Sequence, residues 1–280
     1  MKLYTGFFQR HSLIIGILLM FLLTWPIDLA NAEVLPFQVP FIIYLFLGWG
    51  FIFASLIMTG LTLGRGAVIA LLKRFLIWRV SWKWYLVAFL LSPAIQLSAI
   101  YLNSAFTRTP IDFSTVFAYK IFGPSANLPL LFLPFLISDA ITNGEEMGWR
   151  GYVLPRLQAK YNALVSSLIL GVVWGFWHLP KFLTPGNTSS FGLFMVRIIA
   201  VAVIYTWIYN NTKGSLLLVT LFHATSNAGG VFLPTGTTVS GENMGAFLIQ
   251  VGLEIVTALV VLIYAGAERL SNTEPKQVQE

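Results

Sequence analysis

Two adjacent carboxylates, Glu145 and Glu146, lie inside a strongly apolar stretch of the chain. Ionisable groups in such a place are expensive to keep and usually have a function. Arg150 follows Glu146 by four residues, so on a helix it lies one turn away and can neutralise that carboxylate. Successive helical residues differ by about 100° in direction, so Glu145 points elsewhere and lacks an obvious partner. A carboxylate in an apolar place without a cation can exchange protons near neutral pH. Glu145 is therefore the first candidate for chemistry.

Three more polar side chains fall in apolar stretches. His178 follows Trp174 by four residues, and Asn227 follows His223 by four, so each pair shares one helix face. Counted at about 1.5 Å per residue from the inner ends of their spans, Glu145 and His223 lie roughly 14–15 Å deep. On the same count Asn227 lies about 20 Å deep and His178 about 22 Å deep. Helix tilt and side-chain reach can close this spread, so the four groups are expected to meet in a polar cavity near mid-membrane.

Together these groups fit acyl hydrolysis. Glu145 and His178 can hold a water and take its proton while it attacks a carbonyl carbon. His223 and Asn227 can offer N–H donors to the oxygen that gains charge. Glu146, Arg150 and Trp174 would support the site, Arg150 by pairing with Glu146 and Trp174 by packing on the imidazole. No serine or cysteine nucleophile is needed.

Composition indicates a membrane protein. Of 280 residues, 57% are hydrophobic and only 10% are charged, far from the average of soluble domains. The absence of cysteine excludes disulfides and thiolate metal sites. The net charge of +6 does not point to nucleic acid, because most of the basic residues lie in short segments between apolar runs.

The expected fold is all-α, a polytopic membrane domain over residues 1–280 with about eight transmembrane helices around the polar cavity. Eight apolar runs are each long enough to cross about 30 Å of hydrocarbon as a helix. They are residues 12–31, 37–62, 84–103, 127–155, 163–180, 191–210, 214–232 and 245–267. Residues 126–232 would form the catalytic core. Residues 65–83 alternate apolar and basic stretches and are expected either to lie on an anionic membrane surface or to form an ordinary basic linker. Residues 268–280 form a polar tail.

The distribution of basic residues predicts the orientation. With the N-terminus inside, the inner segments hold most of the Lys and Arg, as the positive-inside rule requires, and both termini are cytoplasmic. The first apolar run has a second interpretation, because Ala30-Asn31-Ala32 resembles the cleavage site of a signal peptide. Retention is favoured because it gives an even number of helices.

Three stretches of the sequence resemble the three motifs of the CPBP family of intramembrane glutamic endopeptidases. They are Glu-Glu-xxx-Arg at 145–150, the aromatic Trp174 four residues before His178, and His223-xxx-Asn227. That family includes CAAX-prenyl proteases and bacteriocin-processing or immunity proteins, and it usually has Phe where this chain has Trp174. The resemblance covers roughly residues 126–232. It implies Glu145 and His178 as water activators, His223 and Asn227 as oxyanion donors, and no metal or other cofactor. It also implies a membrane-associated peptide or protein substrate, prenylated or a leader peptide, in a bacterial cell membrane.

Less specific interpretations stay open. Glu146 and Arg150 could be only an ion pair, and each histidine could only bridge helices by hydrogen bonding. Arg197 and Glu254 are also charged within apolar runs and could pair with each other. Two other functions remain as alternatives. One is a zinc metallopeptidase that uses Glu145, His178 and His223 as ligands, although the chain lacks the His-Glu-x-x-His spacing. The other is a non-catalytic immunity or transport protein.

Overall fold

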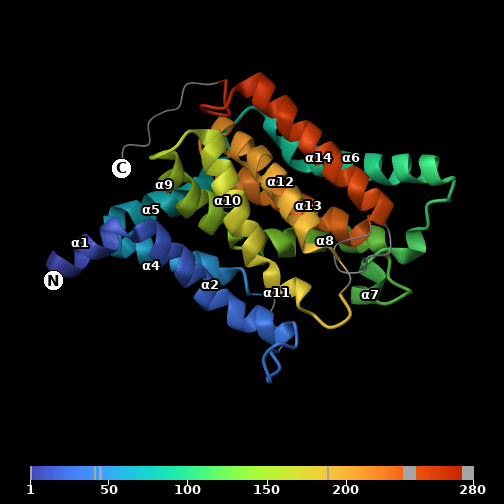
Figure 1. The fold of residues 1–280 in the computed structure, drawn as a ribbon, viewed down its shortest axis with the longest axis horizontal. Coiled ribbons are helices and arrows are strands. Elements are labelled where there is room, and N and C mark those ends of the chain that lie inside the picture. Colours follow the sequence, from blue (N-terminus) through green and yellow to red (C-terminus); the bar gives the residue numbers. More distant parts are fainter. Residues whose placement is uncertain (1, 41, 44–45, 188, 236–243, 273–280) are drawn as a thin grey trace.

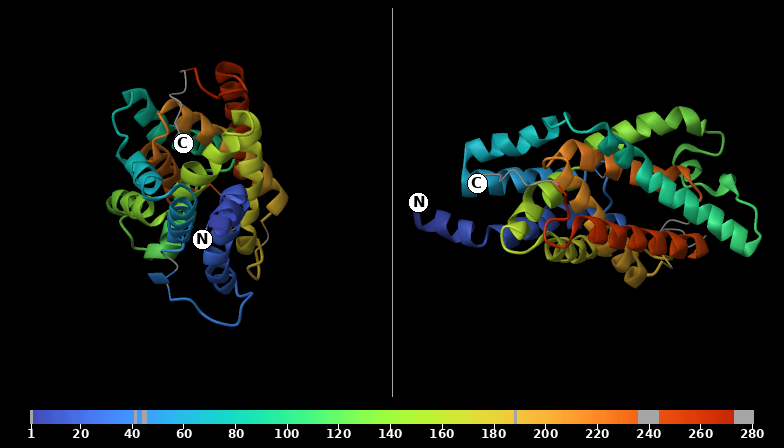
Figure 2. Two further views of the ribbon diagram at one scale, coloured as in Figure 1. Left: turned by 90° about the vertical axis from the view of Figure 1, so that its left-hand side faces the viewer. Right: turned by 90° about the horizontal axis from the view of Figure 1, so that it is seen from above.

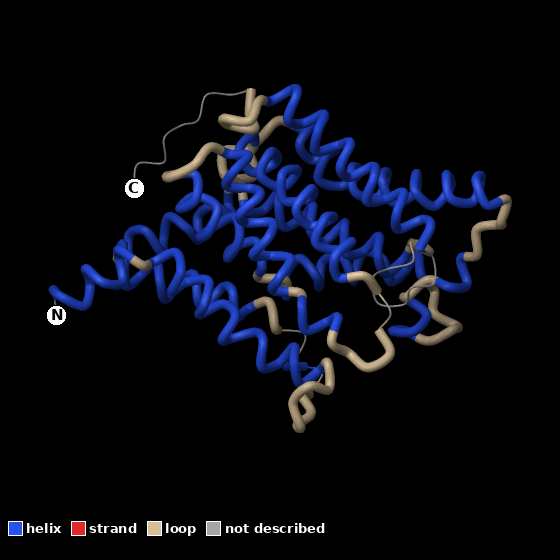
Figure 3. The backbone as a smooth tube through the Cα atoms, in the orientation of Figure 1, coloured by secondary structure: helices blue, strands red, loops and turns tan. Residues whose placement is uncertain are grey.

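The computed structural model describes residues 2–40, 42–43, 46–187, 189–235 and 244–272, and the side chains from residue 6 onward within those ranges. Part of the predicted polar tail, residues 273–280, lies outside the described residues, as do residues 236–243. Throughout the described ranges the regular structure is helical, and Figure 3 draws helices and loops there but no strand. The predicted all-α fold is confirmed.

The helices follow the predicted apolar runs with shifted ends. They are α1 (Lys2–Arg10), α2 (Ser12–Asn31), α4 (Trp49–Leu63), α5 (Arg65–Lys73), α6 (Trp82–Thr107), α7 (Ala118–Phe122), α8 (Leu128–Thr142), α9 (Leu154–Gln158), α10 (Ala163–Trp177), α11 (Leu179–Phe182), α12 (Phe191–Asn211), α13 (Leu216–Phe232) and α14 (Met244–Ala265). Tighter or wider turns form η1 (Arg74–Leu76), η2 (Phe113–Thr115) and η3 (Met147–Val153).

Helix length divides the apolar helices into two classes. Among the described residues, α2, α6, α12 and α14 are apolar and long enough to cross a membrane, at 20, 26, 21 and 22 residues. The other four, α4, α8, α10 and α13, have 15 to 17 residues. At about 1.5 Å per residue these short helices span only roughly 22–26 Å. Large apolar side chains on the long helices face outward, among them Phe106 and Ile263 at 78% and 84% exposure. The chain is therefore an integral membrane protein with several spans.

Helices α10, α12 and α13 lie at the centre of the bundle, with α2 and α4 on one side and α6 and α14 on the other (Figure 1). Helix α10 packs along α12, and α12 packs along α14. Helix α6 contacts both α13 and α14, while α13 also contacts α8. Helices α2 and α4 form a second pair that joins the rest through η3. Seen from above, α6 extends past the other helices at its C-terminal end (Figure 2, right).

One predicted span is not a single helix. Residues 127–155 were expected to form one continuous span, but α8 ends at Thr142 and η3 begins at Met147. The physical cause lies in Asn143 and Gly144. Asn143 has extended backbone angles, and its side-chain oxygen accepts the N–H of Glu145 at 3.0 Å. Gly144 packs against the backbone of Gly48 so closely that a Cβ would lie 2.2 Å from the Gly48 carbonyl oxygen.

The basic segment 65–83 forms α5 and η1, followed by an irregular stretch that leads into α6. Hydrogen bonds join it to other parts of the bundle. The Arg74 guanidinium donates to the Tyr209 hydroxyl, and Ser215 donates to the carbonyl of Ile77 at 2.7 Å. Its contact with an anionic membrane surface stays a prediction.

Candidate active site

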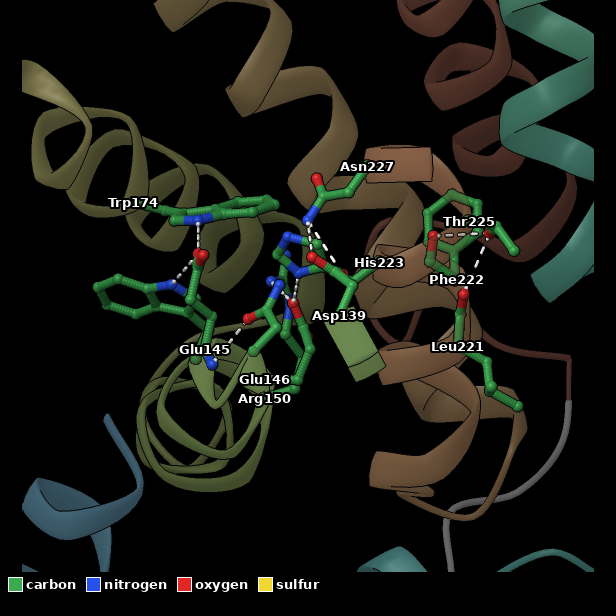
Figure 4. Close-up of polar contacts among 12 residues, drawn as sticks. Asp139, Glu145, Glu146, Arg150, Trp174, Leu221, Phe222, His223, Thr225 and Asn227 are labelled. Atoms are coloured by element: carbon green, nitrogen blue, oxygen red, sulfur yellow. Dashed lines mark hydrogen bonds and ion pairs between the residues drawn. The ribbon is translucent and has the colours of Figure 1, made fainter. Parts of the chain in front are cut away.

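Glu145 is the first residue after the break between α8 and η3. Its Oε2 accepts hydrogen bonds from two indole N–H groups, those of Trp174 at 2.8 Å and Trp149 at 3.4 Å (Figure 4). The side chain is buried, at 8% exposure. Within the described part of the chain no cation pairs with it. The carboxylate is thus held by neutral donors on one oxygen.

Glu146 points the other way and forms the predicted ion pair. Its Oε1 lies 3.0 Å from Nη1 of Arg150, with both side chains fully buried. The same oxygen lies 2.8 Å from Nδ1 of His223 on α13. A carboxylate oxygen accepts, so His223 presents Nδ1–H to Glu146 and turns Nε2 away from it. The two adjacent glutamates therefore have different partners, one neutral and one cationic.

Arg150 is enclosed by aromatic rings as well as by Glu146. Its guanidinium lies 4.4 Å from the ring centre of Trp174 and 4.1 Å from that of Tyr205. These distances are in the range of cation–π attraction, which is strong when the cation is desolvated. Arg150 thus links the Glu146 pair to Trp174, and Trp174 in turn contacts Glu145.

His178 follows the last residue of α10, directly before Leu179 and Pro180. Its Nδ1 lies 2.9 Å from the backbone oxygen of Trp174, one turn earlier. A carbonyl can only accept, so Nδ1 carries a hydrogen, and in the neutral ring the lone pair lies on Nε2. The ring packs edge-on against Trp177 at 4.7 Å and Phe194 at 5.0 Å between centres. Nε2 of His178 is thereby the basic nitrogen of this ring.

Asn227 lies one turn beyond His223 on α13, as its spacing predicted. Its amide nitrogen lies 3.2 Å from each carboxylate oxygen of Asp139 on α8. Figure 4 places this pair beside His223. An amide nitrogen has two hydrogens, so Asp139 fixes the orientation of the Asn227 side chain.

Trp174 connects the predicted site residues. Its N–H bonds to Glu145, and its ring lies 6.0 Å from the His178 ring and 5.8 Å from the His223 ring. Glu145, His178 and His223 therefore gather around one indole. Asn227 does not contact that indole but belongs to the neighbouring pair with Asp139.

Sequence reasoning missed three residues of the site. Trp149 lies four residues after Glu145, a spacing that places the two on one face and could have been noticed. Asp139 accepts a hydrogen bond from Asn227 on another helix, which residue spacing does not indicate. Tyr205 gave no signal, because its contacts with Trp174 and His223 join different helices.

The segment that holds these residues is similar to known proteins. The family model described as "Type II CAAX prenyl endopeptidase Rce1-like" matches residues 125–229. The curated "CAAX prenyl protease 2" of Methanococcus maripaludis is 27% identical over 189 residues, which are 64% of this chain and 64% of that protein. Over this segment the chain is similar to CAAX prenyl proteases. All the proposed site residues lie within the segment that the family model matches, whereas α2, α4, α6 and α14 lie outside it.

The zinc alternative would use Glu145, His178 and His223 as ligands. Among the side chains that the structure describes, no three His, Asp or Glu residues are grouped as metal ligands. The Nδ1 atoms of His178 and His223 are directed to the Trp174 carbonyl and to Glu146, so Nε2 is the nitrogen of each ring that could bind a cation.

A second ion pair joins α12 to α14. Arg197 on α12 donates from Nε and Nη2 to Oε1 of Glu254 on α14, at 3.2 and 3.0 Å. Gln250 donates to the same oxygen at 3.0 Å. The two charges that the sequence allowed to pair with each other do so. The pair joins two of the long helices and explains why both charges are tolerated in apolar spans.

Proposed function

We propose that this protein is an intramembrane peptidase that hydrolyses a peptide bond of a membrane-associated peptide or protein. Water activated by Glu145 and His178 would be the nucleophile. The observation that carries the proposal is the position of Glu145, a buried carboxylate held by two neutral N–H donors, one of them from the indole against which both imidazole rings lie. Within the described residues no cation pairs with this carboxylate, so it has a free oxygen that can accept a proton as a general base does.

The reaction would take two steps. First, the water oxygen bonds to the scissile carbonyl carbon while its proton passes to Glu145, assisted by Nε2 of His178. The carbonyl electrons move to the oxygen. In the second step the carbonyl re-forms, the C–N bond breaks, and the proton goes to the departing nitrogen. The products are a carboxylate and an amine, and no enzyme residue is consumed.

Charge on the tetrahedral oxygen would be stabilised by Asn227 and His223. One amide hydrogen of Asn227 bonds to Asp139, and the other is available for the oxyanion. His223 gives Nδ1–H to Glu146, so a second N–H at Nε2 requires the imidazolium form. Glu146 lies against that ring and favours its positive charge. This is the electrostatic role that donors fixed in a dry site perform best.

The substrate class follows from location and family. A CAAX protease homologue with its carboxylate among membrane helices would act on chains that are themselves bound to the membrane. A C-terminally prenylated protein is the first candidate, and a leader peptide of a membrane-bound precursor is the second. Bacterial origin and cytoplasmic termini belong to this proposal as well.

The decisive experiment compares the wild-type protein with Glu145→Gln, purified in mild detergent, on a library of prenylated and unprenylated membrane peptides. Glutamine keeps an acceptor oxygen for the indoles of Trp149 and Trp174, so the variant is expected to fold. We expect cleavage by the wild type and at least a thousandfold loss in the variant, a typical magnitude for essential catalytic groups. Glu33→Gln, at an exposed carboxylate, is the matched control and should cleave normally. Full activity of Glu145→Gln would remove the basis of the mechanism.

A further inference from the structure

Helix α2 is bonded to the residue that precedes His178. The Trp25 indole N–H donates to the backbone oxygen of Trp177 at 3.0 Å. In return, the Trp177 indole N–H donates to the Thr24 hydroxyl at 2.8 Å. Two neighbouring residues of α2 thus hold Trp177 at its backbone and at its side chain. These three residues, Thr24, Trp25 and Trp177, form what we call the clasp.

The backbone bond of the clasp is made where a helix ends. Trp177 is the last residue of α10, and the final carbonyls of a helix have no N–H partner one turn further on. In a membrane an unpaired carbonyl costs several kcal/mol, so an external donor is needed. Trp25 supplies that donor. The carbonyl concerned belongs to the peptide that joins Trp177 to His178, so the bond fixes the plane from which the imidazole projects.

The side-chain bond of the clasp acts on the same imidazole. The Trp177 ring meets the His178 ring edge-on, with centres 4.7 Å apart and planes at 77°. Thr24 is itself fixed, because its hydroxyl donates to the Met20 carbonyl at 2.8 Å. Trp177 is 2% exposed and Thr24 is fully buried. The indole therefore has little freedom to rotate, and neither has the ring that packs on it.

Helix α2 has one more contact at this corner. Asp28, one turn after Thr24, is buried at 2% exposure and interacts electrostatically with Lys181 on α11. The Lys181 ammonium also lies 5.6 Å from the centre of the Trp177 ring. The face of α2 that carries Thr24, Trp25 and Asp28 thus packs against the turn between α10 and α11, which contains His178.

We propose that Thr24 and Trp25 are positioning residues for His178. Helix α2 thereby contributes to the active site, although it lies outside the segment that the family model matches. This inference rests on the proposed function, in which Nε2 of His178 assists the attack of water. A misplacement of about 1 Å can cost roughly a hundredfold in rate when the geometry of attack is strict. Losing one positioning bond should therefore lower the rate of the chemical step more than the binding of substrate.

The test measures kcat and KM for Thr24→Val and Trp25→Phe, which remove the acceptor and the donor of the two bonds while keeping most of the volume. We expect kcat to fall roughly tenfold in each, the size of effect that loss of one buried hydrogen bond produces, with KM within about twofold. Thr24→Ser keeps the hydroxyl and should restore kcat. The matched control is Thr206→Val, which breaks the buried 2.7 Å bond to Ser167, near the other end of the same helix α10. It should leave kcat unchanged.

The outcomes separate this inference from the function on which it rests. Wild-type kcat in Thr24→Val, with Glu145→Gln inactive, would overturn the clasp and leave the peptidase intact. An equal loss in Thr206→Val, or no recovery in Thr24→Ser, would overturn the positioning role and indicate a general loss of packing. Full activity of Glu145→Gln would instead refute the peptidase mechanism itself.

Discussion

Replacing Glu146 by glutamine is expected to destabilise the fold more than any other single conservative change at the site. Its Oε1 accepts from Arg150 and from His223, and both Glu146 and Arg150 are completely buried. Removing one partner of such a pair leaves an uncompensated buried charge and costs about 3–5 kcal/mol. Arg150 has no second acceptor, since its Nε and Nη2 atoms are buried without hydrogen-bond partners among the described residues.

A double variant separates charge from packing. Glu146→Gln with Arg150→Met removes both charges and leaves an apolar side chain of similar length between the rings of Trp174 and Tyr205. With both charges of the buried pair removed, no uncompensated charge remains, so the double variant should recover most of the 3–5 kcal/mol lost in Glu146→Gln, to within about 1 kcal/mol. Its activity should remain low, because His223 has lost its carboxylate. Stability and catalysis would then respond differently to the same pair of residues.

The assay is reversible unfolding in mixed micelles with increasing SDS, followed by the fluorescence of the nine tryptophans. The wild type, both single variants and the double variant complete a thermodynamic cycle. A coupling energy near zero, or a double variant as unstable as Glu146→Gln alone, would show that the stability of the site does not depend on charge neutralisation.

Three further predictions concern the same region. Trp174→Phe keeps an aromatic ring but removes the 2.8 Å hydrogen bond to Glu145. We expect kcat to fall roughly tenfold or more, with the unfolding midpoint nearly unchanged. A kcat equal to that of the wild type would show that Trp149 suffices as the donor to Glu145. Gly144→Ala places a Cβ 2.2 Å from the Gly48 carbonyl oxygen, so it should displace Glu145 and abolish cleavage. Gly252→Ala, at a position with open space around it, is the control and should cleave normally. Cleavage by Gly144→Ala would show that the contact between Gly48 and Gly144 can adjust. Prolonged dialysis against EDTA and 1,10-phenanthroline should leave kcat unchanged, and recovery of lost activity by added zinc would favour the metallopeptidase alternative.

Local spacing predicted those parts of the site that lie within one helix. The Glu146–Arg150 pair and the common face of His223 and Asn227 both follow from a four-residue separation, and both are found. The break before Glu145 was missed, although Asn143-Gly144 is a dipeptide typical of turns. The apolar residues on both sides outweighed that signal in the interpretation of residues 127–155.

Most hydrogen-bond partners between helices could not be predicted from one sequence. Nothing in the spacing relates Asp139 to Asn227, or Glu146 to His223, which are 88 and 77 residues apart. The choice of partner depends on the depth and rotation of each helix, and those are set by packing over the whole bundle. The clasp between α2 and α10 is a contact of the same kind, at a separation of 153 residues.

The positions of Glu145 and His178 follow a common physical rule. Glu145 comes just after the end of α8, and His178 just after the end of α10, and both helices are too short to cross about 30 Å of hydrocarbon. Helix ends leave backbone groups without partners, so irregular backbone at membrane depth is tolerated only where protein covers it or water reaches it. Asn143 accepts the N–H of Glu145 at the start of the segment that follows α8, and Trp25 donates to the carbonyl of Trp177 at the end of α10. Both helix ends thus obtain a hydrogen bond from outside the helix, and each of these bonds adjoins a side chain to which we assign the chemistry.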